Sequence, residues 1–433
     1  MDNEKISRAK ALPGFLICLA IAAAVYIFMT LLQPHLSPAG GTLFGWNWLD
    51  LAGGCAEGSL FYRFMWLLID LDQGTFMASI LGTVFLLVGL AIATHLEKKG
   101  SPHMGTGVFG ASPIIFRMVL CAIAGLILGQ IVNDICGLIV GTNPFASYGW
   151  VPTFAIFLSA QVLVAFYGVT PAKMITITIL ASIITYLCCW FFLHFVVLPL
   201  GLPLFCAVSF GLIVTMPICS EIIRLLPWTR PEKAPAEAPT EAADAVEAAA
   251  ETVEEAAAEA PAEAPAAPAA PSETKWFIHQ TCSDVGQLVV WGSSIAIMLM
   301  YVGSIINWII NPMNPGYSMG NFPMMIASQI ATAALAIFIY YPRWKKNGFT
   351  FTFGGIVFSS AIIITYPNHW LIVALAIILG AVVLGPFIDW IMKTFNKNNR
   401  YHALFFVQIG IGLCVFAFSM IVKHVLMPAL GLV

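Results

Sequence analysis

The chain alternates between long apolar stretches and short polar segments, and eleven of the apolar stretches have the length of a membrane span. A hydrocarbon core of about 30 Å is crossed by roughly 20 mostly apolar residues in a helix. Because lipid offers no partner to backbone N–H and C=O groups, each stretch is expected to be helical. The predicted spans lie near residues 12–34, 74–94, 114–133, 150–168, 171–197, 203–226, 284–310, 322–342, 350–366, 369–392 and 402–427.

The composition agrees with this pattern. Of the 433 residues, 60% are hydrophobic and only 9% are charged, and the mean hydropathy is +0.89. A water-soluble domain carries roughly 25% charged residues. The sequence therefore predicts an all-α, polytopic helical membrane protein with about 11 transmembrane helices. The first span is too long for a signal peptide and lacks a clear cleavage site, so it is expected to be retained.

The basic residues predict the orientation, because Lys and Arg collect in cytoplasmic loops. If the N-terminus lies inside, every second loop should be basic. Four of the intervening loops, at 133–150, 198–202, 311–322 and 367–369, contain no Lys or Arg. This predicts a multi-pass protein of a bacterial-type plasma membrane (the inner membrane), with a cytoplasmic N-terminus and an outward C-terminus. The basic loop residues are Lys98, Lys99, Arg117, Lys173, Arg224, Arg230, Lys233, Lys275, Arg343, Lys345, Lys346, Lys393, Lys397 and Arg400.

One segment, residues 228–275, has a different composition, rich in Ala, Glu and Pro. It contains 11 of the 22 acidic residues, so the net charge of −3 reflects this segment and not the membrane body. Such a segment cannot bury enough apolar surface to fold alone, which predicts a disordered cytoplasmic linker. Two interpretations remain open, a tether between two membrane halves or an arm that docks a cytoplasmic partner.

A short pattern rich in helix breakers occurs twice. "NPFASYGWVP" at 143–152 and "NPGYSMGNFP" at 314–323 share Asn, Pro, Ser, Gly and Pro at the same offsets. The match extends upstream to Asn133 and Asn307, and downstream to Tyr186 and Tyr366, each of which ends an Ile-Ile-Thr-Tyr sequence. Each unit contains four spans, an even number, so the sequence predicts a parallel (same-orientation) internal duplication of four-helix units.

These features predict the following organisation. Residues 1–113 form two transmembrane helices and an outward interfacial segment at 45–74, in which the apolar run 60–71 is too short to span and forms an interfacial or re-entrant helix. This segment is interpreted either as a lid or as an ordinary loop of aromatic anchors. The remaining parts are repeat 1 at 114–227, the linker at 228–275, repeat 2 at 276–395 and a last transmembrane helix at 396–433.

The repeated polar residues are the candidate solute-binding groups. Asn133 and Asn307 lie near the outer ends of equivalent spans, where an amide is costly unless it is hydrogen-bonded. Related by a pseudo-twofold axis, they would face a common cleft and bind a small polar molecule, or they would only fasten helices together. The two copies of the repeated pattern, at 143–152 and 314–323, are called the first and second connectors. Each is interpreted either as a structural turn or as a ligand contact. The other candidates are Ser147, Ser318, Tyr186 and Tyr366.

Three acids are candidates for binding a coupling proton or sodium ion. Asp134 stands beside Asn133 without a cation nearby in the sequence. Glu221 and Asp389 occupy matching positions near the inner ends of their units. Arg224 and Lys393 follow them by three and four residues, which favours interfacial ion pairs over a coupling site.

No catalytic motif is present, and the cysteines and histidines lack the spacing of metal or haem ligands, so neither enzyme activity nor a cofactor or metal is predicted. A duplicated bundle with few charges favours a secondary carrier or passive permease for a small polar solute. The expected partners are membrane lipid, the solute and a second copy of the chain, with no nucleic acid. The alternatives are a non-catalytic subunit or scaffold of a larger membrane complex and, on weaker grounds, an intramembrane lipid-modifying enzyme.

Overall fold

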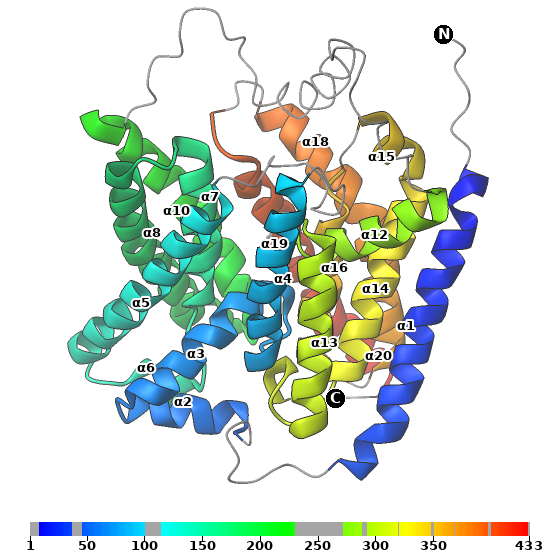
Figure 1. Ribbon diagram of the computed structural model, residues 1–433. Helices are drawn as coiled ribbons and strands as arrows, with labels where there is room; N and C mark the ends of the chain where they lie inside the picture. The colour runs from blue at the N-terminus through cyan, green and yellow to red at the C-terminus, as the bar shows by residue number, and fades with distance from the viewer. Residues whose placement is uncertain are drawn as a thin grey trace, which may run out of the picture.

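The computed structural model describes residues 8–36, 46–99, 114–229, 272–287, 292–318, 320–347, 350–367, 369–396 and 400–431. These residues form an all-helical bundle and contain no β-strand. Figure 1 shows most of the long helices running side by side between the two ends of the bundle. The predicted linker lies almost entirely outside the described residues, which resume at Ser272 and enter α12 (Glu273–Val285).

Among the described residues, seven helices are long and apolar enough to cross a membrane, which fits a membrane-embedded protein. They are α1 (Leu12–Leu32), α5 (Ile115–Val140), α8 (Pro171–Phe192) with its extension α9 (Leu198–Leu200), α10 (Phe205–Leu225), α14 (Phe322–Ile339), α17 (Trp370–Leu379) continued by α18 (Gly385–Phe395), and α19 (Ala403–Ile421) continued by α20 (Met427–Ala429).

The count of eleven spans is not confirmed, although a helix occupies each predicted window. Helices α3 (Leu60–Asp72) and α4 (Ile80–Lys98) are long and apolar enough to span a membrane only when taken together, and the pair is bent by 71°. Three more apolar helices are shorter than a full span, namely α7 (Phe154–Tyr167), α13 (Ser294–Ile310) and α16 (Phe353–Thr365).

The bend between α3 and α4 is built from backbone conformations that a helix cannot contain. After Asp72, the short turn η3 (Gln73–Thr75) is followed by Phe76 at φ 63° and Ala78 at φ 46°. Left-handed conformations interrupt a right-handed helix and are costly for residues other than glycine. The apolar run at 60–71 therefore belongs to a helix that enters the bundle and stops, while α2 (Trp48–Ala56) precedes it at one end of the bundle (Figure 1).

Helices α4 and α13 run antiparallel in close contact. The start of α4 meets the end of α13, where Asn307 accepts a hydrogen bond from Leu81 N at 3.2 Å. Further along α4, a Cβ on Gly89 would lie 2.6 Å from the Cα of Ala296, near the start of α13. A Cβ on Gly303 would likewise lie 2.5 Å from the Leu81 carbonyl oxygen. Glycine at these crossings lets the two backbones approach, as at helix interfaces in membranes.

Three long helices contain a π-helical turn, at η4 (Leu193–Val197), η7 (Gly380–Leu384) and η8 (Val422–Leu426). In each case a proline follows two residues later, at Pro199, Pro386 or Pro428. Proline lacks an N–H and its ring clashes with the carbonyl four residues earlier, so the preceding turn widens. The three helices continue beyond the π turn instead of ending.

The packing does not confirm the predicted parallel duplication. In the first half, α5 packs against α7 and α8, and α8 packs against α10. Under the predicted alignment α13 and α14 would correspond to α5 and α7, yet the main partners of α14 are α1, α16 and α12, whereas α13 packs mainly on α4. Helix α1, predicted to form a unit with α4, packs instead on α14 and α12 at the edge of the bundle (Figure 1).

The close α4–α13 contact makes a prediction about stability. Replacing Gly89 with Ala places a methyl group against the Ala296 backbone, which cannot rotate away, so we expect a loss of about 1–3 kcal/mol. Thermal unfolding of the purified protein in detergent should show a lower midpoint. The matched control is Gly53→Ala in α2, where a Cβ would meet no atom within 4 Å. Equal midpoints for the two variants would contradict the tight crossing.

Candidate functional site

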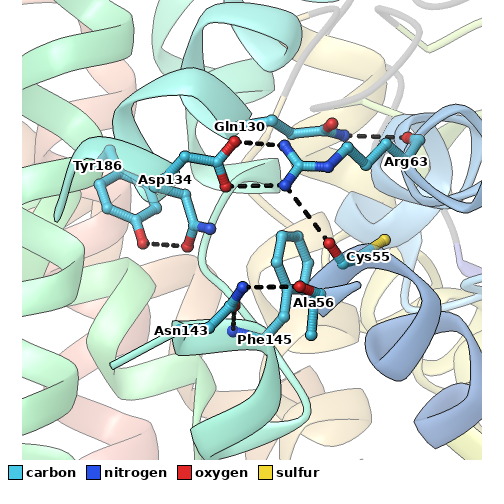
Figure 2. A network of polar contacts seen from close by, with 9 residues as sticks. Cys55, Ala56, Arg63, Gln130, Asp134, Asn143, Phe145 and Tyr186 are labelled. Atoms are coloured by element: carbon cyan, nitrogen blue, oxygen red, sulfur yellow. Dashed lines mark hydrogen bonds and ion pairs between the residues drawn. The ribbon is translucent and has the colours of Figure 1, made fainter. Parts of the chain in front are cut away.

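The first connector, residues 143–152, is hydrogen-bonded to α2 (Trp48–Ala56). Asn143 caps α6 (Pro144–Tyr148) by accepting a hydrogen bond from Phe145 N at 3.0 Å. Its amide nitrogen donates to the carbonyl oxygen of Ala56, at the end of α2, over 3.1 Å (Figure 2). In return, Trp48 at the start of α2 donates its indole N–H to the Gly149 carbonyl at 2.6 Å. The connector therefore contacts both ends of α2.

The second connector, residues 314–323 in the other half of the chain, is hydrogen-bonded to Trp46, just before α2. Asn314, the counterpart of Asn143 in the repeated pattern, donates to the Trp46 carbonyl at 3.0 Å, and Asn311 donates to the same oxygen at 3.1 Å. The ring of Tyr317 lies 5.0 Å from that of Trp48. Both copies of the pattern thus use an asparagine to bind a backbone carbonyl of the α2 segment, which explains why the asparagine recurs.

The predicted pair Asn133 and Asn307 is fully buried, but the two side chains bind different partners. Asn133 accepts a hydrogen bond from Tyr186 at 2.5 Å, so two predicted site residues do meet, and its amide nitrogen has no partner. Asn307 accepts from Leu81 N and donates to Asn314 Oδ1 at 2.9 Å. Their hydrogen bonds place them in two separate networks, one with α8 and the other with α4 and the second copy of the repeated pattern.

The remaining predicted contact residues are spread over the bundle. Ser147 is exposed in α6. Ser318 ends the turn η6 (Gly316–Ser318), and its side chain lies outside the described part of the structure. Tyr366 follows α16 and donates to the Ser419 carbonyl of α19 at 3.2 Å. Ser147 and Tyr366 form no hydrogen bond with Asn133 or Asn307 among the contacts of the described residues.

Asp134 has a cation partner that the sequence did not reveal. Arg63 of α3 binds it through two hydrogen bonds of 2.5 and 2.9 Å, and the Arg63 carbonyl accepts from Gln130 at 3.1 Å (Figure 2). The same guanidinium reaches the Cys55 carbonyl at 3.4 Å. A bidentate pair of this kind fixes geometry as well as charge. It attaches α3 to α5 and balances the charge of the acid.

Glu221 is also ion-paired. It binds Arg224 at 2.9 Å, the expected partner, together with Arg400 at 2.9 Å and the Tyr401 hydroxyl at 3.0 Å. These contacts join the end of α10 to the segment that precedes α19, and the Glu221 side chain is 42% exposed.

Asp389 pairs with a different residue from the one expected. Its partner is Arg343 of α15 (Tyr341–Asn347), rather than Lys393 on its own helix. All three predicted coupling acids therefore have a basic partner, and their role in coupling stays a prediction.

Sequence reasoning missed the acids that are most deeply buried. Asp70 and Asp72 end α3, Asp284 lies in the last turn of α12, and all three side chains have 0% exposure. Asp72 accepts hydrogen bonds from Ser79 N at 3.0 and 3.1 Å and so closes the break before α4. Asp70 accepts from Gln73 at 2.9 Å, but its second oxygen has no partner. Asp284 has the Thr352 hydroxyl as its hydrogen-bonding neighbour, which cannot satisfy both carboxylate oxygens.

The break between α3 and α4 is surrounded by polar side chains from the second half of the chain. Gln329 of α14 donates to the Thr75 carbonyl at 2.7 Å and to Ser360 of α16 at 3.0 Å. Its amide oxygen accepts from Tyr301 of α13 at 2.9 Å. Three helices thus converge on one interruption of the backbone, deep in an apolar bundle. This break, together with its acids, is the candidate functional site.

No cluster of three or more His, Cys, Asp or Glu in the described residues could hold a metal ion. No protein-family model, curated protein or solved structure matches this chain.

The two asparagine contacts make a prediction. Asn314 is 1% exposed, and its removal would also deprive Asn307 of an acceptor, so Asn314→Ala should cost about 1–3 kcal/mol. Asn143 is half-buried, where water can replace the lost bonds, and Asn143→Ala should cost about 1 kcal/mol. Thermal unfolding compares the two variants, and hydrogen exchange at residues 46–56 reports whether α2 is released. A larger loss for Asn143→Ala would refute this assignment.

Proposed function

We propose that this protein is an integral membrane transporter, a secondary carrier or passive permease, for a small polar solute. One observation carries the proposal, namely the interruption between α3 and α4, where buried acids, amides and hydroxyls from four helices gather. Polar and ionisable groups inside a membrane are expensive and usually mark a pathway for ions or solutes. Non-helical backbone at membrane depth is tolerated where it lines such a pathway.

The proposal includes the finer topology inferred from the sequence. Eleven segments cross or enter the membrane of a bacterial-type cell, with the N-terminus inside and the C-terminus outside. The supporting feature of the fold is that helices occur in all eleven windows, with α3 and α4 sharing one bent path. The short helices α7, α13 and α16 enter without spanning the full thickness by themselves, which suits elements that end at a central site.

Uptake of solute into proteoliposomes tests the proposal directly. Metabolite libraries are screened with imposed proton or sodium gradients, and the variant Gln329→Met is compared with wild type. We expect uptake to fall about tenfold or more, because the amide binds Thr75 at the break. The control Gln408→Met removes another buried amide, which accepts from Ser209 on α10, and should retain uptake. Absence of uptake for every solute and gradient would overturn the carrier interpretation.

A second experiment separates a transporter from a scaffold subunit. Deleting residues 235–271 should leave the uptake rate unchanged if this segment is only a tether. If the protein instead serves as a membrane scaffold that docks a cytoplasmic partner, the deletion should release that partner, as seen by size-exclusion chromatography of the native membrane extract. In that case the full-length protein should show no solute uptake.

A further inference from the structure

The two breaks in the chain carry the same residues at the same spacing. Aligned without a gap, "DLDQGTFMAS" from Asp70 and "DVGQLVVWGS" from Asp284 share the aspartate, a glutamine three residues later and a serine nine residues later. The alignment continues to Gly89 and Gly303 on the helices that follow. This relation joins α3–α4 to α12–α13, and it differs from the predicted parallel alignment.

The described residues on either side of the two breaks also have similar local structure. Asp70 lies near the end of α3 and Asp284 near the end of α12. The residues before the two serines, Ala78 and Gly292, both have positive φ, at 46° and 81°. The serines themselves each cap the next helix, with Ser79 accepting from Gly82 N at 3.0 Å and Ser293 from Ala296 N at 3.3 Å.

The packing relates the two breaks by an inverted twofold axis. Helices α4 and α13 cross antiparallel, and in the alignment Gly89 corresponds to Gly303 and Gly82 to Ala296. The contact of Gly89 with Ala296 is therefore equivalent to the contact of Gly303 with the backbone next to Gly82. The antiparallel direction places the two copies in opposite orientations across the membrane.

The helices that follow each break repeat the same neighbours. Helix α5 packs on α3, α7 and α8, as α14 packs on α12, α16 and the α17 segment. The short helix α7 packs on α10, as the short helix α16 packs on α19, and α10 and α19 pack on each other. Each half is thus a broken helix followed by four helices, whereas α1 has no counterpart. Inverted repeats of this kind hold ions and solutes at their broken helices.

The two aspartates occupy equivalent surroundings. The polar neighbours of Asp70 are Trp66 and Thr153, and Thr153 is the N-cap residue of α7. The polar neighbour of Asp284 is Thr352, the N-cap residue of α16, the counterpart of α7. Each carboxylate therefore lies at the start of a short helix, where the helix dipole favours negative charge. One hydroxyl cannot satisfy both carboxylate oxygens of Asp284, so this carboxylate is only partly satisfied within the described residues.

No described residue forms an ion pair with Asp70 or Asp284, in contrast to Asp134, Glu221 and Asp389. The titratable groups that face Asp70 are acidic or neutral, namely Asp72 on the same helix, Cys55 of α2 and Tyr317 of the second connector. Side-chain oxygens of Gln73 and Gln287 also lack partners. An isolated carboxylate in such surroundings is too costly to persist without a cation.

We propose that Asp70 and Asp284 each bind one exchangeable monovalent cation, H⁺ or Na⁺, and form a pair of equivalent sites on the two inverted halves. When the cation is a proton, it occupies a carboxylate oxygen. When it is Na⁺, the ligands are the carboxylate and the neighbouring threonine and glutamine oxygens, which suit a hard cation. The inference rests on the proposed transport function, for which it names the coupling ion.

Cation-dependent stability of the purified protein in detergent tests the two sites without any solute. Replacing KCl with NaCl at constant ionic strength should raise the unfolding midpoint by about 2–4 °C near saturation if the cation is Na⁺. If it is H⁺, the midpoint should instead rise as the pH falls from 9 to 5, equally in both salts. Asp70→Asn and Asp284→Asn should each reduce the response, and the double variant should abolish it.

Asp134→Asn is the matched control, since Asp134 is an acid of the same bundle that already has a basic partner. It should keep the full cation response. Loss of the response in Asp134→Asn with retention in the double variant would overturn the assignment, as would a wild-type protein that responds to neither cation.

Two further measurements cover the case in which the asparagine variants fail to fold. Thr153→Val and Thr352→Val keep the side-chain shape and remove one hydroxyl. In the Na⁺ case each should weaken Na⁺ binding at its site about tenfold, because an oxygen ligand is lost. In the H⁺ case each should instead strengthen proton binding, because the lost hydroxyl stabilises the charged carboxylate. Binding of radiolabelled sodium to wild type should give two ions per chain in the Na⁺ case. Unchanged affinity in both valine variants would refute the proposed ligands. Intact cation binding without uptake of any solute would refute the transport function alone.

Discussion

The arrangement depends on one constraint, that a backbone interrupted inside an apolar bundle must find partners for its polar groups without help from water. The break after α3 meets this constraint locally through Asp72, whose carboxylate accepts from Ser79 N. It meets it at long range through Gln329, which binds the Thr75 carbonyl from the other half of the chain. An unsatisfied buried group costs about 1–3 kcal/mol, so the break can persist only while the second half remains docked. The two halves are therefore coupled at the site itself.

The same need to satisfy buried polar groups with hydrogen bonds explains why the connector sequence is repeated. An asparagine amide offers donors and an acceptor on one short side chain, so it can cap a turn and bind a neighbouring carbonyl at the same time. Asn143 does this between α6 and Ala56. Asn314 instead accepts from the Asn307 side chain while it donates to the Trp46 carbonyl. Both connectors lie at the end of the bundle that holds α2, and both must hold that segment. A shared local task is a sufficient reason for a shared local sequence, with no need for superimposable halves.

Sequence reasoning predicted the helical class and a helix in every apolar window, because helix length and hydrophobicity are local properties. It also paired Glu221 with Arg224, which lie one turn apart. It missed the Arg63–Asp134 and Arg343–Asp389 pairs, since these join segments that only the fold brings together. The buried site was missed for a related reason. Asp70 stands in a segment whose aromatic residues and charges resemble a surface loop, and its equivalence to Asp284 becomes visible only once α4 and α13 are seen to cross.

The two internal similarities have different physical meanings. The connector pattern preserves turn residues, and turn chemistry can recur wherever a chain must bend in the same way. The similarity of the breaks preserves a buried acid with an unsatisfied oxygen, a positive-φ residue, a capping serine and a glycine at a backbone crossing, and these residues act together in one geometry. Asp70 and Asp284 are fully buried without a basic partner among the described residues, which reduces stability, so packing alone does not account for an acid at both breaks. Each of the two carboxylates lies where a broken helix meets the start of a short helix of the same half, α7 or α16, so a cation bound there would strengthen the packing within that half.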